Sequence, residues 1–231
     1  MKKFFFSFCL SLIFITQISY ANENILNKEN AIQTRINNVG INILNSNKIT
    51  KRIIFTYDKA SKKEFRLLDK TLTDRQFIFY DGLYKFIEND DELAGVLARE
   101  IVLAQKSYHG LWGGKLDTLQ IALSSKKFEI YADMRAVDYM VKAGYNPLGL
   151  ITFIHKYYPQ KKSDFISRHN LTSKRLAKIY EYITIKYPVY IENNLYLNNP
   201  NYQNFLLSSL ENRKMLEEKL LTNSNEELDY E

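Results

Sequence analysis

One apolar stretch, residues 92–105, constrains the fold of this chain most strongly. Its sequence, ELAGVLAREIVLAQ, contains no proline and a single glycine. The residues just before it, Asn89 to Asp91, are types that cap helix N-termini, and their carboxylates suit the positive end of a helix dipole. We therefore predict a long helix over about residues 91–108. The open question is whether it is an ordinary buried helix or the helix of a functional site.

The rest of the chain is predicted to be mainly helical. Glycine and proline are scarce, with 8 and 4 of 231 residues. Apolar residues at Ile32, Ile36, Val39 and Ile43 have helical spacing. Further helices are predicted over about residues 83–87, 127–143, 147–157 and 172–186, of which the second is ended by Gly144 and Pro147.

Two short runs rich in β-branched and aromatic residues are predicted to be strands. They are RIIFTY at residues 52–57 and QFIFY at residues 76–80, and a polar, charged segment separates them. Asp81 and Gly82 end the second run in a turn. The expected fold class is therefore α+β, mainly helical with a small β-sheet.

The first 21 residues have the layout of a secretory signal peptide. Two lysines precede an apolar run over residues 4–15, and the small residues Ser19 and Ala21 form a cleavage site. We expect an exported protein, periplasmic or secreted, with an uncleaved membrane anchor as the alternative. The single cysteine, Cys9, lies in the apolar run, so the mature protein would have no disulfide, catalytic thiolate or cysteine-bound zinc.

Charge and composition limit the partners of the mature chain and indicate its division into domains. The net charge of +6 is mild and scattered, which argues against a nucleic-acid partner. No segment beyond the leader has the roughly 20 apolar residues of a membrane span. We expect one domain over residues 22–187 and a C-terminal helical tail over residues 188–231, with a charged helix at 205–221.

Three segments carry a resemblance to a known family. They are FIFYDGLYKFIENDDELAGVLAREIVLA at residues 77–104, FEIYADMRAVDYMVKAGYNP at 128–147 and SRHNLTSKRLAKI at 167–179. In this order and spacing they resemble peptidase family M-48, the gluzincin zinc metalloendopeptidases. The resemblance covers roughly residues 30–187 and implies a metallopeptidase-like domain.

The resemblance assigns roles to five residues. The family's HExxH helix supplies two zinc-binding histidines and a glutamate that deprotonates the metal-bound water. Glu100 matches that general base, and Glu129 matches the third zinc ligand. Asp133 matches the carboxylate that orients a ligand histidine, while His169 and Arg175 match the family's late loop.

Both histidine positions of the motif are replaced, by Arg99 and Leu103. A guanidinium stays protonated and leucine has no donor atom, so neither can bind zinc. His109 and His155 belong to other segments, and His169 with one carboxylate would form an incomplete site. We therefore expect no cofactor; zinc is expected only if an atypical ligand set exists.

The surviving carboxylates suggest a substitute for the metal. Glu129 and Asp133 are four residues apart on one helical face, where two like charges repel. We expect the Arg99 guanidinium to bridge them in place of zinc. The alternative is that Arg99 is an ordinary exposed helix residue and that Arg175 belongs to a helix-capping region near Thr172.

The resulting functional hypothesis is an exported pseudopeptidase. We expect it to bind a peptide or a protein without zinc-dependent hydrolysis, with the strand at residues 76–80 receiving an extended peptide by β-augmentation. One alternative is an active zinc metalloendopeptidase with an atypical ligand set. Another is an envelope interaction protein that uses its C-terminal tail.

Overall fold

The computed structural model describes residues 26–62, 65–69, 75–106, 125–158 and 171–230. The leader expected at residues 1–21 lies outside these ranges. The fold is α+β, mainly helical with one small sheet, as predicted from the sequence. Within the described ranges, no helix is both long and apolar enough to cross a membrane.

The sheet contains three strands, β1 (Ile53–Asp58), β2 (Phe65–Asp69) and β3 (Arg75–Tyr80), in the order β1-β3-β2. β3 is the central strand, parallel to β1 and antiparallel to β2. The two strands predicted from the sequence are confirmed within a residue at each end. β2 was not predicted, because the charged residues around it conceal the strand pattern.

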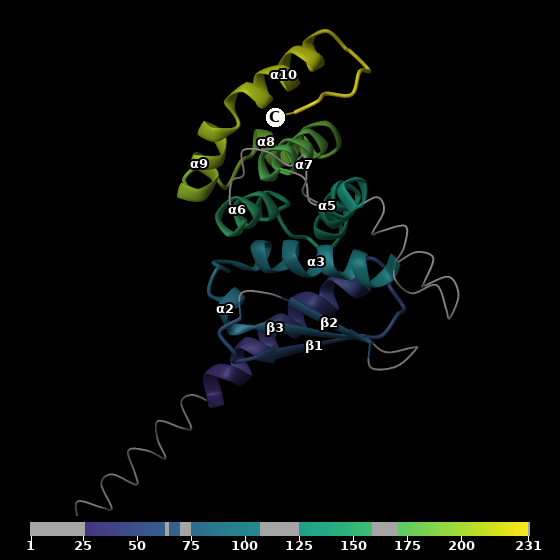
Figure 1. The fold of residues 1–231 in the computed structure, drawn as a ribbon, viewed down its shortest axis with the longest axis vertical. Helices are drawn as coiled ribbons and strands as arrows, with labels where there is room; N and C mark the ends of the chain where they lie inside the picture. The colour runs from purple at the N-terminus through teal and green to yellow at the C-terminus, as the bar shows by residue number, and fades with distance from the viewer. Residues whose placement is uncertain (1–25, 63–64, 70–74, 107–124, 159–170, 231) are drawn as a thin grey trace, which may run out of the picture.

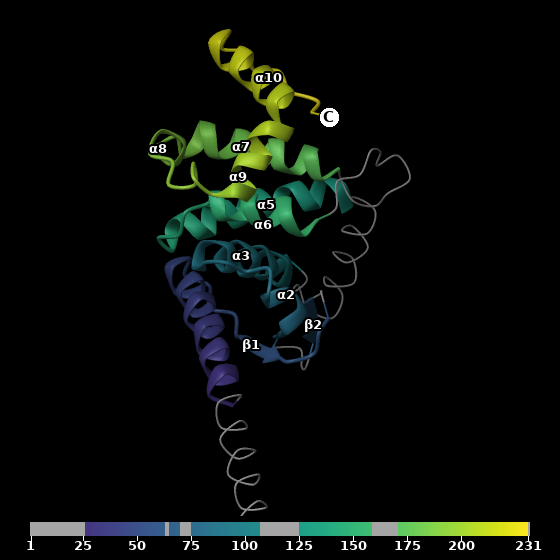
Figure 2. The same ribbon diagram turned by 90° about the vertical axis from the view of Figure 1, so that its left-hand side faces the viewer.

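A helix over residues 26–46 covers the β1 side of the sheet (Figure 2). Gln33 on this helix pairs with the backbone of β1: its side-chain nitrogen donates to the Phe55 carbonyl at 3.0 Å, and its oxygen accepts from the Tyr57 N–H at 2.7 Å. The helix can approach so closely because Gly40 faces the Phe55 ring, where a Cβ atom would lie 2.5 Å from a ring carbon. The Gln33 amide thus occupies hydrogen-bonding positions at this edge of the sheet.

The helices stack in layers on one side of the sheet (Figure 1). α3 lies nearest to it and contacts both α5 and α6 in the next layer, and α7 packs on α5 and α6. Asn89 caps α3 by accepting a 2.9 Å hydrogen bond from the Glu92 N–H, as the cap pattern predicted. These helices are α2 (Asp81–Tyr84), α3 (Asp90–Lys106), α5 (Ser125–Lys142), α6 (Leu148–Tyr157) and α7 (Thr172–Lys186).

The segment after Pro188 forms α8 (Val189–Glu192), α9 (Pro200–Ser208) and α10 (Leu210–Leu221). The single helix expected at residues 205–221 is interrupted at Ser209, whose backbone leaves the helical conformation. Tyr196, Tyr202 and Phe205 are buried in the main hydrophobic core. The first half of the tail is therefore part of the core and not an appendage, because its aromatic side chains complete the packing over α6.

Candidate functional site

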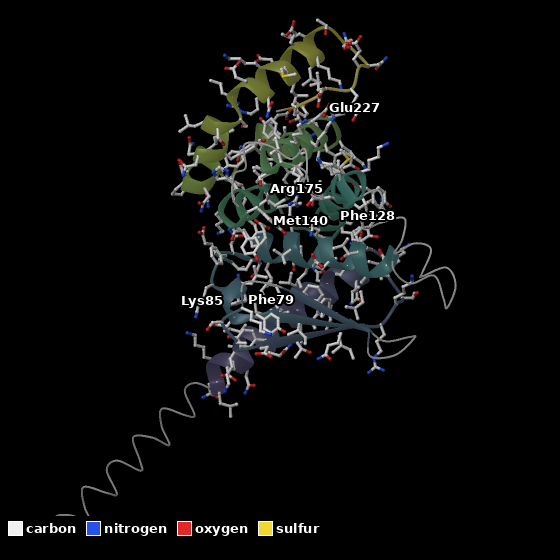
Figure 3. The ribbon with its side chains drawn as sticks, viewed as in Figure 1. Phe79, Lys85, Phe128, Met140, Arg175 and Glu227 are labelled. Carbon is white, nitrogen blue, oxygen red and sulfur yellow. The ribbon has the colours of Figure 1, made fainter. Side chains whose placement is uncertain are left out.

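Five of the residues singled out in the sequence analysis meet where α3, α5 and α7 cross. α3 contributes Arg99 and Glu100, α5 contributes Glu129 and Asp133, and α7 contributes Arg175. Figure 3 shows Arg175 inside the helical layers, away from the sheet. The helices therefore bring together residues that lie up to 76 positions apart.

Asp133 is the centre of this cluster. Its side chain is only 1% exposed. Arg175 donates from Nε to Oδ2 at 2.8 Å and from Nη2 to Oδ1 at 3.0 Å, which is a bidentate pair. Arg99 adds a third hydrogen bond, from Nε to Oδ1 at 2.8 Å. Two guanidinium groups thus share one buried carboxylate.

Glu129 lies between the same two arginines. Its Oε1 is 3.4 Å from Arg175 Nη1 and 3.8 Å from Arg99 Nη2. The expectation that Arg99 bridges Glu129 and Asp133 is confirmed, and its alternative, an exposed Arg99, is wrong, since that side chain is 16% exposed. Arg175 is the second cation of the cluster, a role that was not predicted from the sequence.

Glu100 completes the cluster on α3. It accepts a 3.1 Å hydrogen bond from Arg99 Nη1. Burial raises the pKa of Glu100, and the positive charge of Arg99 offsets this only in part. Burial acts against the charge on Arg99, but the Asp133 carboxylate outweighs it and raises the pKa of Arg99. A protonated Glu100 would leave two guanidinium groups facing two carboxylates, which is a balanced set of charges.

Little space remains beside the cluster. The cavity next to Arg99 and Glu100 has a volume of about 10 Å³ and is closed by Leu150, Phe153 and Tyr158 among others. A cavity of this size holds at most one water molecule. Along the residues that the structure describes, the space beside Arg99 and Glu100 is filled by protein side chains.

The donor set does not fit zinc. Arg99 and Leu103 offer no lone pair, and Leu103 packs against the hydrophobic core. The Asp133 oxygens already accept three hydrogen bonds from guanidinium groups. In the described part of the chain, no three histidine, cysteine or acidic side chains form a group that could hold a metal ion.

One of the three histidines, His155, lies within the described residues. His169 and His109 lie at positions 159–170 and 107–124, outside the described ranges. His155 is on α6, where burial lowers its pKa. The role expected for His169 therefore stays a prediction from the resemblance.

The strand expected to receive a peptide is in the wrong place for that role. Residues 76–80 belong to β3, which has β1 on one side and β2 on the other. Its backbone hydrogen bonds are therefore used within the sheet, and the β1 edge faces the Gln33 amide. The outer side of β2 is the remaining edge of the described sheet.

A second buried ion pair, between Glu92 and Lys156, was not predicted from the sequence. Glu92, with no exposed surface, accepts hydrogen bonds from Thr152 Oγ1 at 2.9 Å and Lys156 Nζ at 2.7 Å. Glu92 is also an acidic residue in the first turn of α3. Its partners come from α6, so no local pattern signals the pair; it ties α3 to α6.

No family model, curated protein or solved structure matches this chain. The likeness to peptidase family M-48 therefore depends on the three sequence segments and their spacing.

Proposed function

We propose that this chain is an exported protein of metallopeptidase ancestry that binds a peptide or protein partner without zinc-dependent hydrolysis. One observation carries the proposal: Asp133 is held by Arg99 and Arg175 at the position where the resemblance would place the zinc centre. The resemblance supports the metallopeptidase ancestry, and the arginine pair supports the loss of zinc-dependent chemistry.

The chemistry of the cluster supports a non-hydrolytic role. Peptide hydrolysis by this family's mechanism needs a metal-bound water and an ionised glutamate to take its proton. Two fixed guanidinium charges repel a divalent cation and engage Glu129, the carboxylate that the resemblance makes a zinc ligand. Glu100 accepts a hydrogen bond from Arg99, so its carboxylate is engaged by a cation instead of facing a metal-bound water.

The cluster supports a structural role instead. Its charges connect α3, α5 and α7, the helices that surround the former catalytic position in this reading. A partner-binding protein benefits from such rigid elements. The outer side of β2, with which no described strand pairs, is the sheet edge at which an extended peptide would add a strand, in place of the strand at residues 76–80.

Metal analysis and a chelator test address the proposal directly. The purified mature protein is expected to contain far less than one equivalent of zinc, and any cleavage of an unfolded protein substrate should be insensitive to chelator. Stoichiometric zinc together with chelator-sensitive cleavage would establish the active enzyme with an atypical ligand set instead. Sequencing the N-terminus of the exported protein checks the leader, since we expect it to begin at Asn22.

A further inference from the structure

An acidic segment, residues 223–230, follows α10 and turns back onto α7 (Figures 1 and 3). Tyr230 is its anchor, because only 2% of this residue is exposed. Burial and the charge of Glu181 raise the pKa of Tyr230, which keeps the side chain neutral. The acidic segment is therefore seated on the protein and not extended into solvent.

Two lysines of α7 meet this segment. Lys174 Nζ lies 3.1 Å from Asp229 Oδ1, and Lys178 Nζ lies 3.2 Å from Glu227 Oε1. The Lys178 ammonium group also lies 5.2 Å from the centre of the Tyr230 ring, a cation–π distance. Two lysines one helical turn apart thus contact two acidic residues and one aromatic ring of the segment.

An open groove of about 910 Å³ lies between the acidic segment and α5. Two more lysines, Lys126 and Lys127, line it from α5, together with the larger side chains of Ile130, Tyr131 and Met134. The groove therefore combines four lysines with an apolar floor. This chemistry suits a negatively charged peptide that also carries an aromatic side chain.

The acidic segment is held weakly by its charges. The Asp229 and Glu227 side chains are 96% and 89% exposed, and exposed ion pairs contribute little to stability. Tyr230 is the main contact. Because a short linker joins the segment to α10, it competes at an effective concentration in the millimolar range. A similar peptide from elsewhere can replace it once the internal copy is weakened.

We propose that the α7 surface now covered by the acidic segment, together with the adjoining groove, is a binding site for an acidic, tyrosine-containing peptide, and that the acidic segment is its internal competitor. The inference does not depend on the metallopeptidase resemblance, because it uses only the lysines, the groove and the seated segment. Under this proposal the chain's own tail limits access to a partner surface.

The test uses a fluorescent peptide of sequence NEELDYE and the full chain in three forms. In the first form Tyr230→Ala removes the anchor, and in the second Glu227→Lys with Asp229→Lys repels the segment from α7 without touching buried residues. Anisotropy should show at least tenfold tighter peptide binding to both altered forms than to the unaltered chain. Circular dichroism checks that each form is folded.

Lysine substitutions show whether the groove is the site. Lys178→Gln, added to the Glu227→Lys and Asp229→Lys form, should weaken peptide binding at least tenfold, because it removes the cation without creating a new ion pair to the segment. Lys142→Gln, at an exposed position at the end of α5, should leave binding unchanged and is the matched control. A peptide with alanine in place of tyrosine should bind at least tenfold more weakly.

Several results would overturn the proposal. One is the absence of saturable binding to either altered form at millimolar peptide, and another is equal binding with and without Lys178. Equal or tighter binding of an RNA oligomer of similar charge would assign the lysines to a general polyanion surface. A dimer that requires Tyr230 and is dissociated by the peptide would assign the groove to a second copy of the chain.

Discussion

Replacing Arg175 by methionine tests the buried cluster most directly. The change removes the two hydrogen bonds to Asp133 and the 3.4 Å contact with Glu129, and it keeps most of the side-chain volume. Arg99 alone would then face two buried carboxylates. We expect the protein to lose stability because a carboxylate without its full set of partners remains in a region of low polarity.

The size of the loss follows from the burial. Breaking a buried ion pair by removing one partner costs about 3–5 kcal/mol, and Asp133 is 1% exposed. With a urea dependence of about 2–3 kcal/mol/M for a domain of this size, the unfolding midpoint should fall by about 1–2.5 M.

Urea unfolding followed by circular dichroism measures this loss, with Arg135→Met as the matched control. Arg135 pairs with Asp138 at 3.1 Å, but Asp138 also accepts 2.8 Å hydrogen bonds from Lys186 and Tyr187. The control should therefore cost no more than about 1 kcal/mol. Adding Asp133→Asn to Arg175→Met should restore part of the stability, since it removes the unpaired charge.

Two outcomes would refute the reasoning. If Arg175→Met and Arg135→Met shift the urea midpoint equally, the cluster is not a buried network of charges. If Asp133→Asn further destabilises the Arg175→Met protein at neutral pH, the charge of Asp133 is not the source of the loss.

Three further changes have defined outcomes. Glu100→Gln should leave stability unchanged below about pH 4.5, the ordinary pKa of glutamate, and should raise stability at higher pH. The reason is that burial raises the pKa of Glu100, so that ionising this side chain in the folded protein costs stability. Urea unfolding across the pH range measures the difference. Gln33→Met should cost about 1–3 kcal/mol by leaving two backbone groups of β1 unpaired beneath the helix, and urea unfolding measures the loss. Arg99→His combined with Leu103→His should bind about one equivalent of zinc, measured by metal analysis; a folded double variant without zinc would contradict the ligand positions assigned by the resemblance.

The sequence predicted the helices and two strands well because their signals are local. The cap at Asn89 and the stop at Gly144 mark helix ends through residues next to them in the chain. β2 and the break at Ser209 were missed because charged neighbours hide the first, and no glycine or proline marks the second. The packing of Tyr202 into the core also had no local signal.

The site was predicted in part. The pairing of Arg99 with Glu129 and Asp133 was expected from the resemblance, which places Arg99 at a ligand position, together with the need to balance two carboxylates on one helical face. The bidentate pair of Arg175 with Asp133 depends on how α7 crosses α5, and a crossing of helices is not written in a local pattern. The position of β3 at the centre of the sheet was unpredictable for the same reason, since β2 supplies its second neighbour.

The shared carboxylate of Asp133 has a consequence for local opening of the molecule. Separating α7 from α5 would remove Arg175 from the buried Asp133 carboxylate, and separating α3 from α5 would remove Arg99 from it. Neither helix can therefore leave alone at low cost in free energy. The three helices therefore form a single cooperative unit, and their slowest amide protons should exchange with solvent only when the whole unit opens. One aspartate thereby makes three segments of chain unfold together.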